Sequence, residues 1–191
     1  MIDFNTELQN NNILLRPLNS NDLEEFLNIT KEQSLWKYYA YDLSIHDELK
    51  KWIDTALDQM NNKTRLAFTV INKDTGEVIG SSSFGNISSH DKRIEIGWTW
   101  LGRDYQGKRI NDQMKYLMMK YCFEECDFER VEFKTDVLNV HARKAFERMG
   151  IVEEGILRSH SLMTNNRRRD TIDYGTLRSE WDKLKIRNNW D

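Results

Sequence analysis

The sequence is poor in cysteine and proline and shows no large excess of either charge. Its 191 residues include two cysteines and one proline, and 28 basic residues stand against 31 acidic ones for a net charge of −3. Nucleic-acid-binding proteins normally carry a strong basic excess, so this balance argues against nucleic acid as a partner. No apolar run approaches the ~20 residues of a membrane-spanning helix, and the first ten residues lack the pattern of a secretory signal. We therefore expect no nucleic-acid and no membrane partner.

The few cysteines and histidines also argue against disulfides and metal sites. Cys122 and Cys126 lie one helical turn apart, where a disulfide would strain the helix, so we expect free thiols in a reducing cytoplasm. The four histidines are scattered, and the two cysteines lack the C-x-x-C spacing of a metal site. The sequence thus predicts a cytoplasmic protein without a bound metal.

The sequence does contain enough apolar and aromatic material for one core. Hydrophobic residues make up 39% of the chain, with six Trp, seven Tyr and eight Phe. The length is typical of one domain, and no repeat, low-complexity tract or proline-rich linker divides the chain. We predict a single domain over residues 1–191.

Hydrophobic periodicity predicts a mixed order of strands and helices. Alternation and turn signals predict strands over 13–18, 65–71, 77–87, 93–101, 130–137, 153–163 and 170–177. Helical spacing predicts helices over 19–29, 44–60, 110–121 and 142–149. Asn21 and Glu24 are spaced like a capping box for the first helix. This order predicts a mixed α/β domain.

A basic loop at 103–109 joins one of these strands to the third helix. Backbone N–H groups at a helix start, with Lys108 and Arg109 beside them, are suited to a pyrophosphate. The loop contains one glycine, Gly107, where phosphate-binding loops often have two or three. On these residues alone, a phosphate site and a solvated turn both remain open.

The strand before this loop carries a carboxylate at its middle. Strict alternation would put Ile94, Ile96, Trp98 and Trp100 on one face, and Glu95, Gly97, Thr99 and Leu101 on the other. A carboxylate beside small residues could act as a general base, or it could be a salt-bridged structural residue. The three arginines at 167–169 leave a similar choice between a grip on an acidic partner and a solvated hairpin tip.

Three stretches together, 95–111, 131–158 and 167–181, resemble the GCN5-related N-acetyltransferase (GNAT) superfamily, and within it the RimJ/RimL-like branch. The resemblance extends from about Ile13 to Trp181, followed by a short C-terminal tail. It implies the α/β GNAT fold: a mostly antiparallel, twisted sheet of about seven strands with a parallel, splayed pair, flanked by about four helices. In that fold the splayed pair is formed by the fourth and fifth strands.

The resemblance implies that acetyl-CoA binds at the basic loop. Gly107 matches the first glycine of the family loop, whose backbone N–H groups hold the pyrophosphate, and Arg109 stands at the second glycine position. Arg109 can still offer its backbone N–H if its φ stays negative. Asn139 matches the residue that opens the fourth helix beside the pantetheine arm. The implied cofactor-binding residues are Trp98, Thr99, Trp100, Leu101, Gln106, Gly107, Lys108, Arg109, Ile110, Asn111, Asn139, Arg143 and Phe146.

The resemblance also assigns roles in catalysis. Glu95 matches the acid that family enzymes use as a base, often through water. A base is needed because a primary amine with a pKa of about 10 is mostly protonated at pH 7. The thioester oxygen would be polarised by a backbone N–H between Trp98 and Leu101. Family enzymes use a serine or a tyrosine as the acid for the leaving thiolate, but Ala142 and Phe146 occupy those positions, so water would protonate the thiolate or it would leave as the anion.

The implied function is transfer of an acetyl group from acetyl-CoA to a primary amine. The acceptor would be a protein N-terminus, as in ribosomal proteins, or a small amine. We expect its entrance at Trp36, Tyr38 and Tyr39 and at the hairpin near Arg167, since aromatic walls suit amines through cation–π contact. The alternative is a non-catalytic CoA-binding or protein-interaction module of the same fold. A homodimer is compatible with both.

Overall fold

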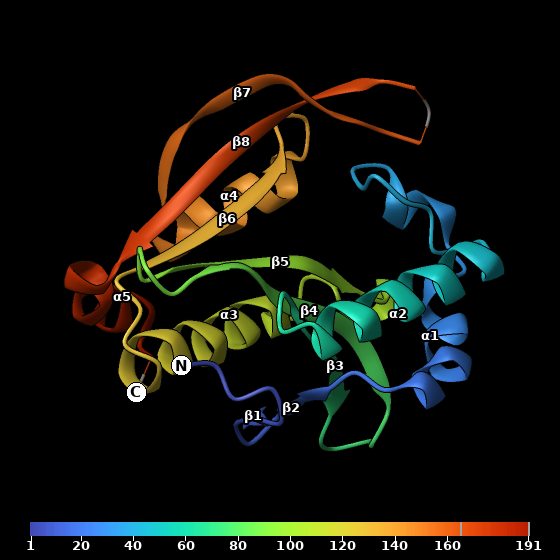
Figure 1. Ribbon diagram of the computed structural model, residues 1–191, viewed down its shortest axis with the longest axis horizontal. Helices are drawn as coiled ribbons and strands as arrows, with labels where there is room; N and C mark the ends of the chain where they lie inside the picture. The colour runs from blue at the N-terminus through green and yellow to red at the C-terminus, as the bar shows by residue number, and fades with distance from the viewer. Residues whose placement is uncertain (165, 191) are drawn as a thin grey trace.

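A computed structural model describes residues 1–164 and 166–190 and shows one eight-stranded sheet. The strands lie in the order β1-β2-β3-β4-β5-β6-β8-β7, and all neighbours are antiparallel except β5 and β6 (Figure 1). The strands are β1 (Leu8–Gln9), β2 (Ile13–Pro17), β3 (Leu66–Asn72), β4 (Val78–Ser88), β5 (Arg93–Leu101), β6 (Arg130–Asp136), β7 (Val152–Leu162) and β8 (Arg168–Leu177). The α-helices are α1 (Leu23–Thr30), α2 (His46–Asn61), α3 (Ile110–Lys120), α4 (Val140–Met149) and α5 (Trp181–Asn188).

The predicted order of elements is confirmed, with two additions. The sheet has an eighth strand, β1, which is only two residues long and so has no alternation that a sequence pattern could reveal. The segment expected to be a C-terminal tail is helix α5, whose Trp181 and Leu184 are buried in the core. Because α5 buries so few of its residues, its polar composition hides the helical stripe.

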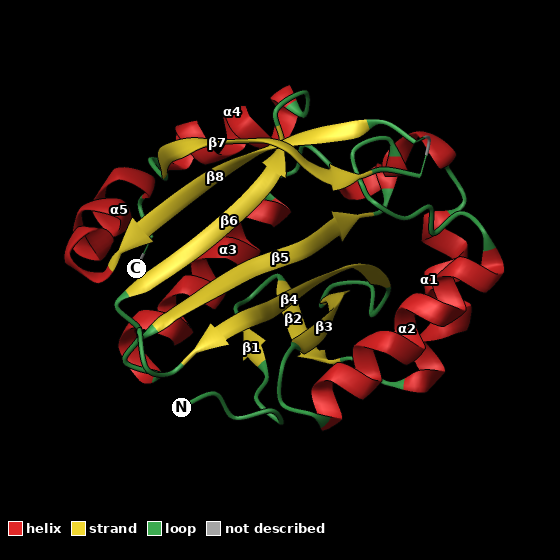
Figure 2. Cartoon of the chain, turned by 45° about the horizontal axis from the view of Figure 1, so that its top comes forward, coloured by secondary structure: helices red, strands yellow, loops and turns green. Residues whose placement is uncertain are grey.

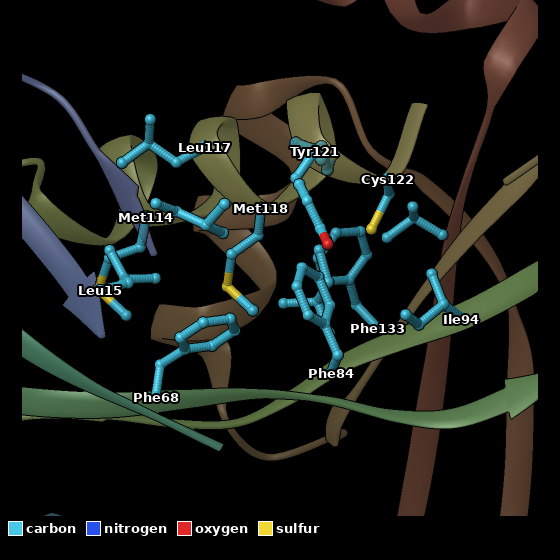
Figure 3. Packing of buried hydrophobic residues seen from close by; sticks show 14 of the residues in the cluster. Leu15, Phe68, Phe84, Ile94, Met114, Leu117, Met118, Tyr121, Cys122 and Phe133 are labelled. Carbon is cyan, nitrogen blue, oxygen red and sulfur yellow. The ribbon is translucent and has the colours of Figure 1, made fainter. Parts of the chain in front are cut away.

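The helices cover the two faces of the sheet unequally. Helices α1 and α2 pack on one face, against β3 and β4, and α3, α4 and α5 pack on the other. The larger core lies under α3, where Met114, Met118 and Tyr121 meet Phe68 and Phe84 (Figure 3). The periodic apolar residues of α3 are therefore its contact with the sheet, as their spacing predicts.

The start of α1 differs from the predicted capping box. Asn19 and Asp22, not Asn21 and Glu24, form the reciprocal pair, at a short 3₁₀ turn that precedes α1. The buried Asp22 carboxylate also accepts hydrogen bonds from Arg16 and from the Thr69 hydroxyl of β3. The tertiary partners of Asp22 thus decide which of two similarly spaced pairs caps the chain.

The cysteines lie where α3 continues into a turn of π-helix, Tyr121–Glu125. Cys122 and Cys126 are both buried and free, as predicted. Within the described residues, no helix is long and apolar enough to cross a membrane, and no group of histidine, cysteine and carboxylate side chains is placed to hold a metal ion.

Strand β5 changes its facing direction at a bulge. Its register against β4 shifts between Ser81 and Ser83, and Trp98 has a φ of 51°, in the left-handed region. Before the bulge Ile94 and Ile96 face the α3 core, but after it Trp98 and Trp100 pack in the α1–α2 core. Conversely, Leu101 joins the α3 core. The predicted strict alternation is therefore wrong beyond residue 97, because an extra residue in a bulge reverses every later side chain.

Strands β5 and β6 separate just after they start. They are paired over Arg93–Glu95 and Arg130–Glu132 only, and then diverge towards their C-terminal ends (Figure 2). This is the parallel, splayed pair that the resemblance predicts. We call the opening between the later parts of β5 and β6 the gap. Helices α3 and α4 begin at the end of the sheet where the gap widens.

Candidate active site

The loop between β5 and α3 leaves the N-terminus of α3 open. Gly107 has a φ of 75°, and a Cβ built there would meet no atom within 4 Å. Arg109, at the N-cap of α3, has a φ of 60°. The negative φ that was the condition for offering its backbone N–H to a phosphate is therefore not found. The Arg109 side chain makes no capping hydrogen bond, which leaves the first N–H groups of the helix without a side-chain cap. Such N–H groups, with exposed Lys108 and Arg109 nearby, favour an anion.

The same loop is tied to the sheet by its neighbours. Gln106 donates from Nε2 to the carbonyl of Leu101 at 3.1 Å. The Tyr105 hydroxyl donates to Glu77 Oε2 at 2.7 Å. These contacts hold the turn against β5 and β4, so the position of the open helix end is set by the sheet. Gln106 therefore has a structural role in the loop in addition to its predicted place beside a ligand.

Helix α4 begins across the gap from α3. The Asn139 side chain accepts a hydrogen bond from the Ala142 N–H at 3.2 Å and so caps the helix. Arg143 donates to the carbonyl of Val137 at 3.1 Å. Phe146 is 7% exposed and its ring packs in the core. Neither Ala142 nor Phe146 can donate a proton, as the sequence indicates.

Glu95 lies at the point where β5 and β6 begin to separate. Its side chain is on the face opposite the α3 core and is 7% exposed. One carboxylate oxygen, Oε2, accepts from Asn86 Nδ2 at 2.7 Å and from Lys134 Nζ at 2.9 Å. The other, Oε1, points towards Gly97, where an added Cβ would lie 2.9 Å from it. Glu95 is thus both ion-paired and adjacent to a small residue that leaves room above the strand.

Two hollows share Lys134, the residue that is ion-paired with Glu95. The first has a volume of about 450 Å³ and the second about 330 Å³, and Lys134 lines both. Asn86, Lys63 and Arg93 are among the residues that line the first. We call these hollows the acceptor side, because they open on the face of the sheet to which Glu95 belongs. Lys134 and Asn86 are site residues that the sequence patterns do not single out, since they become neighbours of Glu95 only through strand pairing.

The opposite side of the gap, which we call the cofactor side, contains a buried lysine. Lys115 of α3 is 2% exposed and donates from Nζ to Thr99 Oγ1 at 2.7 Å. Its Nζ also lies 5.4 Å from the centroid of the Phe133 ring of β6. Burial lowers the pKa of the Lys115 ammonium to about 7, against an opposing effect of the Glu95 carboxylate.

Sequence reasoning missed Lys115, although a signal was present. Lys115 lies three residues before Met118 and four before Met119, which are both fully buried. A lysine at helical spacing among buried methionines departs from the apolar pattern of α3. Lysine is rarely buried without a partner, so such a position indicates either a local polar contact or a function.

The aromatic segment before α2 does not form the open wall that was expected. Trp36 is 3% exposed and packs edge-on against Trp100, so it belongs to the core. The Tyr39 hydroxyl donates to the carbonyl of Thr99 at 2.7 Å, beside the bulge of β5. Burial raises the pKa of Tyr39. Tyr38 and Tyr39 are both partly exposed, and Tyr39 packs against the α1–α2 core.

Arg65 of the loop before β3 lies under this segment. Its guanidinium is within 4.9 Å of the Trp52 ring centroid and 4.6 Å of that of Trp98. Its Nε donates to Ser83 Oγ at 2.9 Å, and burial lowers its pKa to about 10. Trp98 in turn lies over Gly85, where a Cβ would be 2.5 Å from the indole ring. The stacking of Arg65 and Gly85 on Trp98 holds the bulge of β5 in place.

The arginines near the β7–β8 hairpin are not simply solvated. Arg167 forms an ion pair with the buried carboxylate of Asp136 at the end of β6. Arg169 donates from Nε to Thr171 Oγ1 at 3.0 Å, and burial lowers its pKa. The Arg167–Asp136 ion pair attaches the hairpin to β6, whereas the Arg169–Thr171 hydrogen bond lies within β8. The turn at Asn165 lies outside the described residues.

Comparisons with known proteins agree with this geometry. The model of the acetyltransferase (GNAT) domain matches residues 12–152. Bacillus subtilis YdaF, named provisionally as a ribosomal N-acetyltransferase, is 28% identical over 179 residues, which cover 90% of this chain and 93% of YdaF. A GCN5-related N-acetyltransferase from Brucella melitensis superimposes with a TM-score of 0.88 at 26% identity, covering 97% of this chain and 85% of its own. A ribosomal-protein-S5-alanine acetyltransferase from Vibrio fischeri shares the fold, with a TM-score of 0.74 at 18% identity over 92% of this chain and 98% of its own.

Proposed function

This chain belongs to the GNAT acetyltransferase family and is an acetyl-transferring enzyme, and we propose that it moves the acetyl group of acetyl-CoA to a primary amine. The observation that carries the proposal is the gap between β5 and β6. An uncapped helix N-terminus adjoins it on the cofactor side, and the Glu95 carboxylate adjoins it on the acceptor side.

The cofactor side supports acetyl-CoA as the donor. A pyrophosphate needs several N–H donors that converge without steric hindrance, and the α3 terminus with Gly107 supplies them. Lys108 and Arg109 add positive charge at the same place. The pantetheine arm would then run along the gap past the start of α4, where Asn139 shapes the helix end. The thioester would reach the point where β5 and β6 separate.

The acceptor side supports attack by a neutral amine. The amine nitrogen attacks the thioester carbon, the carbonyl π electrons move to oxygen, and the amine gives up a proton. We assign that proton to Glu95, directly or through water, because its carboxylate is bonded to Lys134, which lines both hollows. A backbone N–H of the bulged segment around Trp98 would stabilise the oxyanion, since β6 no longer pairs with this part of β5.

We propose a peptide N-terminus as the acceptor. The two adjoining hollows form a surface that continues on both sides of Lys134, which suits an extended chain better than a compact amine. The name of YdaF points to ribosomal proteins as acceptors in a relative. The alternative acceptor, a small amine, is to be tested against the peptide N-terminus. The free, buried cysteines suit a reducing cytoplasm, where we place the reaction.

Two measurements test the function. Acetyl-CoA should raise the melting temperature by an amount that grows with its concentration, because it binds the folded state. A thiol-release assay should then show CoA production with peptides that begin with Ser or Ala, and less with small polyamines. No thermal shift at about millimolar acetyl-CoA would contradict the choice of donor. A clear shift without thiol release from any amine would instead favour the non-catalytic module.

A further inference from the structure

Lys115 is the buried group that the reaction above leaves unused. Among the ion pairs of the described residues, the Glu95 carboxylate is bonded to Lys134, and Lys115 has no carboxylate partner. Its contacts are the Thr99 hydroxyl and the face of the Phe133 ring. Burying an ammonium without a bonded anion costs folding free energy, so a lysine kept at this position indicates a ligand or a function.

The position of Lys115 is set by two strands that have separated. Thr99 belongs to β5 beyond the bulge, and Phe133 belongs to β6 beyond the last residue paired with β5. Lys115 contacts both, so its Nζ lies across the gap on the cofactor side. If the donor enters from the α3 and α4 side and the amine from the Glu95 side, the thioester sulfur lies on the side of Lys115.

We propose that Lys115 is the general acid that protonates the departing CoA thiolate, an inference that rests on the proposed acetyl transfer. When the tetrahedral intermediate collapses, the C–S bond breaks, its electron pair goes to sulfur, and the Lys115 ammonium gives one proton to form the thiol. The amine loses one proton to Glu95. Net charge is restored when that proton passes through solvent from Glu95 back to the neutral Lys115 amine.

Two further observations support this role. The positions that carry an acid in the resembling family hold Ala142 and Phe146, neither of which can donate. The Phe146 ring lies 5.3 Å from Phe133, the ring that Lys115 also contacts. Lys115 therefore reaches the same neighbourhood from α3 that a tyrosine at position 146 would reach from α4. With a pKa near neutrality, it holds a transferable proton at working pH.

The charged groups around Lys115 are consistent with proton exchange. The Glu95 carboxylate of β5 makes no hydrogen bond with Lys115, but its negative charge favours the protonated form of the lysine. Lys134 of β6 is bonded to the same carboxylate and so reduces that effect. The Thr99 hydroxyl, which also contacts Ser82 Oγ at 2.8 Å, accepts from Nζ and keeps it directed at the gap. Thr99 is a positioning residue in this scheme.

The first test needs no acceptor. CoA is bound to the wild type and to Lys115→Met, and the thiolate is followed by its ultraviolet absorbance as pH rises. Because Lys115 and the bound thiol titrate as a coupled pair, part of the thiolate absorbance should appear near pH 7 in the wild type, about 1 to 3 units below the single thiol titration of Lys115→Met. Equal thiol pKa values in two proteins that both bind CoA would overturn the proposal while leaving acetyl transfer intact. Failure of the wild type to bind CoA would overturn both.

The second test uses acetyl-CoA and a peptide with a free N-terminal Ser. Lys115→Met should lower kcat by about 10² to 10⁴-fold with little change in KM for acetyl-CoA. The rate ratio of wild type to variant should fall as pH rises above 7, because Lys115 then loses its proton. Adding Phe146→Tyr to Lys115→Met should restore much of kcat by supplying a phenol. Lys120→Met, on the same helix, should behave as wild type.

The outcomes are separable. Loss of activity that Phe146→Tyr does not restore, with an unchanged pH profile, would reduce Lys115 to a structural residue. An acetyl group found on Lys115 by mass spectrometry after incubation with acetyl-CoA alone would show that it acts as a nucleophile, and would also overturn its role as the acid.

Discussion

The cofactor side and the acceptor side of the gap are built in different ways. The cofactor loop is one continuous stretch between β5 and α3, and its residues with a positive φ are Gly107 and Arg109. The acceptor side brings together Asn86 of β4, Glu95 of β5 and Lys134 of β6. The first depends on local backbone conformation and the second on strand pairing. Substitutions in the cofactor loop and on the acceptor side should therefore separate acetyl-CoA binding from turnover.

The largest expected effect is on turnover at the acceptor side. Glu95→Gln keeps the size of the side chain and its contacts with Asn86 and Lys134 but cannot take a proton. We expect the rate at neutral pH to fall by about 10² to 10⁴-fold, with little change in acetyl-CoA affinity. The defect should shrink as pH rises and more acceptor amine is neutral.

Glu132→Gln is the matched control for this substitution. Glu132 is the register partner of Glu95 across the β5–β6 pair and is ion-paired with Arg130. Because Glu132 also lines the second hollow, the KM for the acceptor can change, but we expect kcat to stay near that of the wild type. A wild-type rate in Glu95→Gln itself would reduce Glu95 to an ion-paired strand residue.

The next effect is on binding at the cofactor side. Gly107→Val places a β-branched residue at a positive φ and fills the space above the loop. We therefore expect the affinity for acetyl-CoA to fall by about 10 to 100-fold. This loss is equivalent to about 1 to 3 kcal/mol of backbone strain. Isothermal titration calorimetry measures the affinity for acetyl-CoA. Gly76→Val is the control, because Gly76 has a φ of 74° and equal open space in the β3–β4 hairpin. Equal affinity in both variants would mean that the loop is only a turn.

A third prediction concerns stability and pH. The Lys115 side chain has a pKa of about 10.4 in the unfolded chain. In the folded protein its pKa is lowered to about 7. Between these values the unfolded state binds more protons, so the stability of the wild type rises with pH in this window. Lys115→Met removes the group. We expect Lys115→Met to be more stable than the wild type at pH 7, by about 1 kcal/mol or more, and the difference to shrink towards pH 10.

Chemical denaturation of both proteins at pH 7, 8, 9 and 10 checks this, since all other titrating groups cancel in the difference. A stability difference that does not change with pH would contradict a depressed pKa for Lys115, without bearing on acetyl-CoA binding.

The smallest effect should be on the choice of acceptor. Lys63, Arg93 and Lys134 line the first hollow, and none of the described residues that line it carries a carboxylate. Peptides with Asp at the second and third positions should therefore be acetylated a few-fold faster at limiting concentration than the same peptides with Lys. Added salt should reduce the preference, since exposed charges are screened over about 10 Å at 0.1 M salt. A preference for Lys would place the acceptor elsewhere.

Much of the fold could be predicted because its signals are local. The one-sided stripes of α2 and α3 are patterns of neighbouring residues, and the structure confirms them. The predictions that failed depended on distant partners. Trp36 lies in an aromatic segment typical of a binding loop, but it packs against Trp100 and Tyr41 in the α1–α2 core. Helix α5 escaped prediction because it packs through few side chains.

The sequence by itself determined the order of strands and helices, the position of Gly107 before a helix start, and the absence of an acid at Ala142 and Phe146. Only the tertiary structure decided that β5 reverses its faces at Trp98, that Lys134 is the partner of Glu95, and that Lys115 lies across the gap. The reason is physical. Side-chain periodicity is a property of one segment, but a bulge and a strand separation are set by the neighbouring strands, and one extra residue reverses every side chain that follows it.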